Sequence, residues 1–80
     1  MSELRLYSRP DCHLCEVAAE LLHQSGIEQV FEHVNIEDDL ALLRRYGIRI
    51  PVLQRMDTGA ELFWPFDQES LLAFLQTEEA

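Results

Sequence analysis

The chain has 80 residues, of which 15 are Asp or Glu and six are Arg, so its formal net charge is −9. This length suits one domain, and we treat residues 1–80 as a single unit. Such an acidic chain is repelled by nucleic acid phosphates and by anionic membranes, so neither is an expected partner. No apolar run reaches the ~18 residues that cross a bilayer, and no signal peptide is recognisable, so the expected location is the cytoplasm.

Two strands and a helix are predicted in the first part of the chain. Residues 4–7 alternate between apolar and polar side chains, and residues 8–11 carry turn-forming ones. From Cys12 the apolar spacing becomes helical, and Gly26 suits the end of this helix. The expected buried face of the helix comprises Leu14, Val17, Ala18, Leu21 and Leu22. The expected buried side of a second strand, over residues 30–36, comprises Val30, Val34 and Ile36.

A short helix is predicted next. Acidic residues 37–39 and arginines 44–45 match the two ends of a helix dipole, and Gly47 follows them. The expected buried edge of this helix comprises Leu40, Leu43 and Tyr46.

A β-hairpin and a last helix complete the chain. Residues 48–56 contain a predicted strand led by residues 50–53, and a second strand is predicted over residues 60–64, with a hairpin turn at residues 57–59 between them. Pro65 ends the second strand because proline cannot donate to a ladder, and Asp67 suits the N-cap of the helix that follows. The apolar positions of that helix are Leu71, Leu72, Phe74 and Leu75.

The element order is therefore β-α-β-α-β-β-α, which defines an α/β protein. We expect the first two strands to pair in parallel with a right-handed crossover, and the last two to form an antiparallel hairpin. The prediction is a four-stranded mixed sheet with helices on both faces.

The cysteines of the chain, Cys12 and Cys15, fall together where the first strand gives way to the first helix. Residues three apart on a helix are neighbours, and their Cα separation of roughly 5–6 Å suits a disulfide. Free N–H groups at the helix start favour the thiolate of Cys12, whereas Cys15 is expected to be more buried. A Cys-X-X-Cys beside a βαβ pattern in a cytoplasmic protein is typical of thioredoxin-like redox proteins, so both cysteines are predicted to be catalytic.

Some neighbouring charges favour the thiolate of Cys12 and others disfavour it. Arg9 is a fixed positive charge that favours the thiolate of Cys12, and His13 adds to it when protonated, whereas Asp11 opposes both. In the expected mechanism, the Cys12 thiolate attacks a substrate disulfide and Cys15 resolves the mixed disulfide. An external reductant then restores the dithiol.

Three motifs resemble the glutaredoxin branch of the thioredoxin superfamily, over nearly the whole chain. They are Leu-Tyr-Ser-Arg-Pro-Asp-Cys-His-Leu-Cys at residues 6–15, Tyr-Gly-Ile-Arg-Ile-Pro-Val at 46–52 and Trp-Pro-Phe-Asp at 64–67. A group of small glutaredoxin-like proteins carries these motifs in the same order. The resemblance implies a glutaredoxin-like thioredoxin fold, a nucleophile at Cys12 and a resolving thiol at Cys15.

The resemblance also assigns substrate-binding residues. It implies a cis peptide between Ile50 and Pro51 that faces the cysteines, with the backbone before the proline pairing with the substrate or with glutathione. Taken alone, Pro51 also fits a proline at the edge of a strand. Arg9 stands where glutaredoxins carry a lysine that holds glutathione and the thiolate, and Asp67 where they carry an aspartate for the amino group of glutathione. The predicted substrate-binding residues are Arg9, His13, Ile50, Pro51 and Asp67.

The sequence departs from glutaredoxins at two places. His13 and Leu14 replace the usual proline and aromatic residue between the cysteines. Trp64 and Pro65 replace a glycine pair that lets glutathione approach the backbone, and their bulk is expected to obstruct the glutathione groove. No tightly bound cofactor is expected. The expected partners are a disulfide-containing protein substrate and a reductant, either glutathione or a reductase, and the expected state is a monomer.

A metal site is one alternative from another functional class. Two cysteines and two histidines suffice for a tetrahedral zinc site, and the chain has three histidines. However, His23 is about three turns down the helix from Cys12, roughly 16 Å at 1.5 Å per residue, and His33 falls on the next strand. Cys12, Cys15 and His13 alone make an incomplete site, which a partner or a second copy would have to complete.

A binding module is the other alternative. In this hypothesis the fold serves only to dock a partner and the cysteines have lost their role. The aromatic residues Phe63, Trp64 and Phe66 would form the docking patch, or they plug the end of a thin core.

Overall fold

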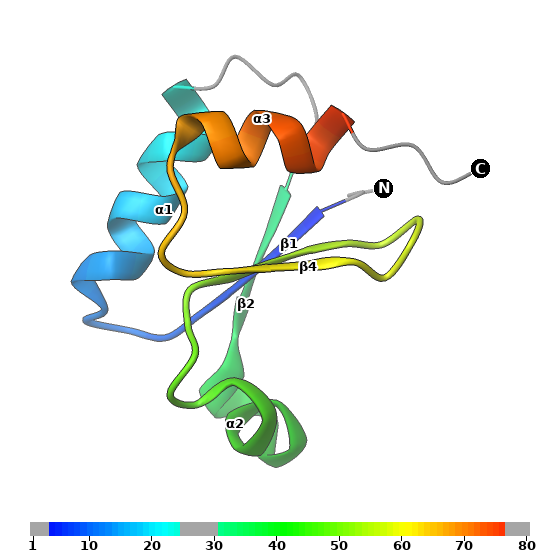
Figure 1. Ribbon diagram of the computed structural model, residues 1–80. Helices are drawn as coiled ribbons and strands as arrows, with labels where there is room; N and C mark the ends of the chain where they lie inside the picture. The colour runs from blue at the N-terminus through cyan, green and yellow to red at the C-terminus, as the bar shows by residue number, and fades with distance from the viewer. Residues whose placement is uncertain (1–3, 25–30, 77–80) are drawn as a thin grey trace.

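The computed structural model describes residues 4–24 and 31–76 and contains one four-stranded sheet with helices on both faces (Figure 1). The strands are β1 (Leu4–Ser8), β2 (Phe31–Asn35), β3 (Val52–Arg55) and β4 (Glu61–Phe63). The helices are α1 (His13–Gln24), η1 (Ile36–Asp38, a 3₁₀ turn), α2 (Leu40–Tyr46) and α3 (Gln68–Gln76). The predicted α/β architecture is confirmed. Within the described ranges, no helix is long and apolar enough to cross a membrane.

The sheet is mixed, with the strand order β2-β1-β3-β4. β1 pairs in parallel with β2 and antiparallel with β3, which in turn pairs antiparallel with β4. Leu6 on β1 lies beside His33 on β2 and beside Leu53 on β3. Because residues paired across strands point to the same side of a sheet, these three side chains share one face.

Each face of the sheet carries its own hydrophobic cluster. Figure 1 shows α1 and α3 on one side of the strands and α2 on the other. The cluster under α1 and α3 contains Leu4, Leu6, Ala18, Leu22, Leu53, Phe66 and Leu71. The cluster under α2 contains Tyr7, Ile36, Tyr46 and Val52, with Val34 packed against it. Val34 and Ile36 thus lie on one side as predicted, whereas Val30 and Gly26 lie outside the described residues.

The predicted buried face of α1 is wrong at one position. Cys15, Ala18 and Leu22 are buried, but Leu14 is 45 % exposed. The helix begins at His13, directly after Cys12, and its sheet-facing stripe therefore starts at Cys15. This leaves Leu14 on the surface beside the cysteines.

The predicted buried edge of α2 is wrong at two positions. Leu40 and Leu43 are 62 % and 38 % exposed, while Tyr46 is buried and Leu42 packs against the core. Asp39 is the N-cap of α2, and its carboxylate accepts a 2.8 Å hydrogen bond from the N–H of Ala41. This cap fixes the residue at which the helix begins, and therefore which of its side chains face the core.

The side chain of Tyr46 fixes α2 to the sheet. Its hydroxyl donates a hydrogen bond to Glu61 on β4, while within the sheet the hydroxyl of Tyr7 on β1 donates to Gln54 on β3 at 2.6 Å. The rings of the two tyrosines stack with centroids 4.5 Å apart. The chain then turns back to β3 through a 3.1 Å bond from the N–H of Ile50 to the carbonyl of Tyr46. α2 therefore positions the segment that enters β3.

The predicted hairpin turn and the predicted cap of α3 are both present. Gly59 has φ = +79°, a conformation that glycine adopts without steric cost. Arg55 pairs with Asp57 and also donates to the carbonyl of Phe74, which ties the hairpin to α3. Asp67 accepts a bond from the helix that follows it.

Candidate active site

Cys12 is the N-cap of α1. Its carbonyl accepts a 3.1 Å bond from the N–H of Glu16, and its sulfur accepts a 3.2 Å bond from the N–H of Cys15. Asp11 turns the chain into the helix with φ = +59°, which aspartate tolerates better than most side chains. The sulfur therefore stands where a Ser or Asp oxygen usually caps a helix, at the positive end of the dipole. In the reduced protein this position favours the thiolate of Cys12.

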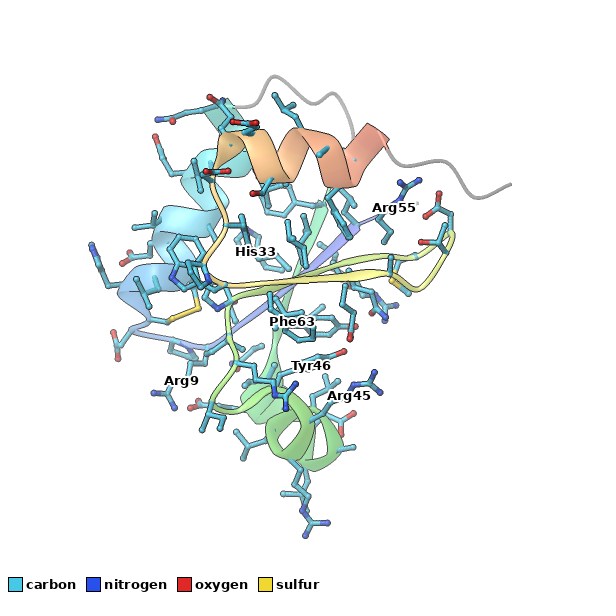
Figure 2. The ribbon with its side chains drawn as sticks, in the orientation of Figure 1. Arg9, His33, Arg45, Tyr46, Arg55 and Phe63 are labelled. Carbon is cyan, nitrogen blue, oxygen red and sulfur yellow. A yellow bond between two sulfur atoms is a disulfide. The ribbon has the colours of Figure 1, made fainter. Side chains whose placement is uncertain are left out.

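Cys12 and Cys15 are joined by a disulfide, drawn as the yellow bond at the start of α1 in Figure 2. Their Cα atoms are 5.2 Å apart, as the spacing predicted. Cys12 is partly exposed, whereas Cys15 is only 5 % exposed. The expected pair of one accessible and one sheltered sulfur is present.

A hollow of about 340 Å³ opens beside the two sulfurs, and we call it the sulfur hollow. It is lined by Ser8, Arg9, Pro10, Asp11, Cys12, Cys15, Glu16, Ala19 and His33. Arg9, which is labelled in Figure 2, is thus brought together with both cysteines, as the sequence predicted. Asp11 and Glu16 bring carboxylates to the same walls, so the hollow is electrostatically mixed.

A second hollow, of about 400 Å³, has Leu14 in its wall, and we call it the apolar hollow. It is lined by Leu14, Ile48, Arg49, Ile50, Phe63 and Trp64. Because Leu14 lies between the two cysteines in sequence, the Cys-X-X-Cys segment contributes to this hollow. Ile48 is 99 % exposed, and the guanidinium of Arg49 lies 5.7 Å from the centre of the Phe63 ring, within cation–π range.

The peptide bond between Ile50 and Pro51 is cis, as the resemblance implied. Pro51 is buried and its carbonyl accepts a 3.3 Å bond from the N–H of Trp64. The N–H of Ile50 donates to Tyr46, so this amide is already engaged within the protein. The bond between Trp64 and Pro65 is also cis, which the sequence did not predict.

Of the five predicted substrate-binding residues, Arg9 lines the sulfur hollow and Ile50 lines the apolar hollow, whereas His13, Pro51 and Asp67 line neither. His13 is exposed and lines a separate hollow on the outer face of α1, together with Glu20 and Gln24. Asp67 caps α3, and its carboxylate accepts a 2.8 Å bond from the N–H of Ser70. This bond holds the pKa of Asp67 below its ordinary value.

The aromatic residues near the site divide between two roles. Phe66 is 6 % exposed and belongs to the core, and Trp64 packs against that core while its ring meets Phe66 edge-on at 5.1 Å. Phe63 is 39 % exposed and borders the apolar hollow. Phe66 and Trp64 therefore pack as the predicted plug of the core, and of these three aromatic residues only Phe63 is exposed.

Sequence reasoning missed His33 and Ile48. His33 was set aside because it falls on the next strand, yet the parallel pairing of β2 with β1 brings it to the sulfur hollow. That pairing was the available signal. For Ile48 the sequence offers none, because its exposure depends on how the loop after α2 folds. In the described part of the chain, no cluster of three or more His, Cys, Asp or Glu side chains is placed to hold a metal ion.

The βαβαββα sheet, with a Cys-X-X-Cys at the start of α1 and a cis proline before β3, defines a protein of thioredoxin fold. Residues 3–76 match the model of the family described as Glutaredoxin-like domain (DUF836). The chain belongs to this family of glutaredoxin-like proteins.

Solved structures agree with this assignment. The chain is 47 % identical to protein XcR50 from X. campestris, with a TM-score of 0.87 over 95 % of this chain and 99 % of that one. It is 32 % identical to protein Ne2328 from Nitrosomonas europaea, with a TM-score of 0.70 over 90 % and 88 % of the two chains. The thioredoxin-like protein BC3987 shares the fold, with 23 % identity and a TM-score of 0.67 over 98 % and 100 %. No curated protein matches the chain significantly.

Proposed function

We propose that the protein is a thiol–disulfide oxidoreductase that reduces disulfides of proteins or small molecules through Cys12 and Cys15. The observation that carries this proposal is the 3.2 Å bond from the N–H of Cys15 to the sulfur of Cys12. It places one sulfur at the positive end of a helix, with the sheltered sulfur of Cys15 within bonding reach.

Each half of the proposed reaction is a thiol–disulfide exchange. The Cys12 thiolate attacks one sulfur of the substrate disulfide, and the other substrate sulfur leaves as a thiolate. The Cys15 thiolate then attacks the Cys12 sulfur, which releases the second substrate thiol and leaves the Cys12–Cys15 disulfide. A thiol reductant, glutathione or a protein dithiol, returns two electrons and restores both thiols.

The apolar hollow supports a role in binding the chain on either side of a substrate disulfide. Leu14, the residue between His13 and Cys15, lines this hollow, and so does the fully exposed side chain of Ile48. Burying such side chains against a substrate releases water and stabilises the complex. Trp64 fills part of this wall, which favours an extended peptide over the compact backbone approach of glutathione.

Trapping of the mixed disulfide tests the proposal. Reduced Cys15→Ser protein, mixed with a peptide that contains one disulfide, is expected to accumulate a covalent adduct, because Cys12 attacks but no thiol resolves it. The matched Cys12→Ser protein retains the sheltered thiol and is expected to form much less adduct over the same time. Equal adduct in the two variants, or none in either, would contradict the assignment of Cys12 as nucleophile.

A further inference from the structure

We propose that His33 acts as the general base that accepts the proton of Cys15 in the second half of the exchange. This inference rests on the proposed oxidoreductase function, and it assigns a role to a residue outside the Cys-X-X-Cys. Its basis is that one hollow brings His33 together with both sulfur-bearing residues.

The fold places His33 under α1. It lies beside Leu6 in the parallel pairing of β1 and β2, and Leu6 belongs to the cluster that α1 and α3 cover. Cys15 and Ala19 are one turn apart on α1 and line the sulfur hollow together with His33. The imidazole rests against the ring of Phe31, with centroids 5.0 Å apart, and His33 is exposed. Water therefore reaches the ring, so a proton can pass between Cys15 and the imidazole through water in the sulfur hollow.

Cys15 needs such a base because it is sheltered. Only a thiolate attacks a disulfide, and the 5 % exposure of Cys15 disfavours a charged sulfur. The backbone N–H of Cys15 donates its hydrogen bond to the sulfur of Cys12. This bond therefore stabilises the thiolate of Cys12 and not that of Cys15. A proton acceptor close to Cys15 removes this obstacle at the moment of attack.

Other charged groups also face the hollow. Arg9 has no lone pair that accepts a proton, so it acts only through its charge. Asp11 and Glu16 are carboxylates, a class of weaker bases than imidazole. Among the side chains that line the sulfur hollow, imidazole is the base best matched to a thiol near neutral pH.

The proton and the electrons balance in each direction. During oxidation of the dithiol, His33 takes the proton of Cys15, the Cys15 sulfur bonds to the Cys12 sulfur, and the substrate leaves as a thiolate that takes up this proton. During regeneration, a reductant thiol gives its proton to the imidazole of His33, its thiolate attacks the sulfur of Cys12, and Cys15 departs as a thiolate that takes this proton from the imidazole. A second thiol of the reductant then displaces Cys12 from the mixed disulfide, so both cysteines are reduced and the reductant leaves as a disulfide.

Rapid mixing of the reduced protein with an aromatic disulfide that releases a coloured thiolate separates the two steps. Attack by Cys12 gives a phase whose rate rises with reagent concentration, and attack by Cys15 gives a phase independent of it. The variants to compare are His33→Gln and the matched control His23→Gln. The ring of His23 also contacts Phe31, with centroids 5.4 Å apart, but His23 does not belong to the lining of the sulfur hollow.

We expect His33→Gln to slow the second phase about tenfold near neutral pH, less than the usual 10²–10⁴ because water competes in an exposed hollow. The deficit should shrink as the pH rises above about 8.5, the ordinary pKa of a thiol, because a growing fraction of Cys15 then ionises without a base. His23→Gln should match the unmodified protein at every pH. The inference is overturned if His33→Gln leaves the rate of the second phase unchanged, or if the variant remains equally slow at high pH.

The outcome for the proposed function is read separately, from the first phase. If Cys12 attacks no faster than free cysteine in every variant, the oxidoreductase assignment fails and the role of His33 falls with it. If the first phase is fast and the second is indifferent to His33, only the role of His33 is overturned.

Discussion

The N–H of Cys15 donates to the sulfur of Cys12 across 3.2 Å, so the resolving residue itself stabilises the nucleophile through its backbone. This arrangement predicts a difference in reactivity between the two thiols of the reduced protein. Cys12 should react with iodoacetamide near neutral pH at least about tenfold faster than Cys15, because it holds more thiolate and is more exposed.

Mass analysis of the two cysteines after a short pulse of reagent measures this difference. The same pulse on protein unfolded in denaturant is the control, because both the helix and the shelter of Cys15 are then gone. The two rates should converge there. Equal rates in the folded protein would contradict the argument.

Ile48 predicts a preference for peptide substrates. Its side chain is 99 % exposed, so Ile48→Ser should leave the melting temperature unchanged. Because burying an isoleucine contributes about 1.5–3 kcal/mol, kcat/KM for a peptide disulfide should fall by about tenfold to a hundredfold. A small aromatic disulfide that does not fill the apolar hollow should react as before.

Leu40→Ser is the matched control for Ile48→Ser, since Leu40 is 62 % exposed on α2 and does not line the apolar hollow. It should leave the rates with both substrates unchanged. An equal loss with Leu40→Ser, or a loss with the small disulfide as well, would argue against peptide binding at Ile48.

The parts of the fold that the sequence predicted are those set by local chemistry. The spacing of Cys12 and Cys15 fixed their separation, because an i, i+3 pair at a helix start has little freedom. Gly59 marked the hairpin through its positive φ, and Asp67 marked the start of α3 through its cap. The cysteine spacing, the turn glycine and the helix cap each act through residues close in sequence, so their effects do not depend on how distant segments pack.

The parts that could not be predicted depend on contacts between distant segments. Leu14 and Leu43 look like core residues, since an apolar side chain on a helix is normally buried, yet both are exposed. Periodicity cannot distinguish a core stripe from an apolar surface that borders a site. For His33 the parallel pairing of β2 with β1 was predicted, but the sequence alone does not set which residues lie side by side, and it is this register that brings His33 to the sulfur hollow.

Tyr46 predicts a loss of stability in strong alkali. Burial and the hydrogen bond to Glu61 raise its pKa from 10.0 to about 12, so the neutral hydroxyl is the form that the fold stabilises. That stability is fully present below pH 10.0 and is lost as the pH rises toward about 12. Denaturant melts across this window should show a steep fall, and Tyr46→Phe should flatten it.

At neutral pH Tyr46→Phe should be less stable by about 1 kcal/mol, because Glu61 loses a donor. The loss is limited because Arg45 remains 3.6 Å from the carboxylate of Glu61. A slope between pH 10.0 and about 12 that is the same in both proteins would show that another group governs the alkaline transition.

Asp67 predicts the opposite dependence, at acid pH. The bond from the N–H of Ser70 lowers the pKa of its carboxyl below 3.8, so the fold stabilises the carboxylate. This contribution is present above pH 3.8 and is lost as the pH falls through the lowered value. Asp67→Ala should lower the melting temperature at neutral pH by a few degrees, because the cap is lost. Asp67→Asn keeps an oxygen that caps equally well, so it should melt close to the unmodified protein at neutral pH and lose less on acidification. Thermal melts at neutral pH and near pH 3 measure both effects. If Asp67→Asn lowers the melting temperature at neutral pH as much as Asp67→Ala does, then the charge of Asp67, and not its capping hydrogen bond, stabilises α3.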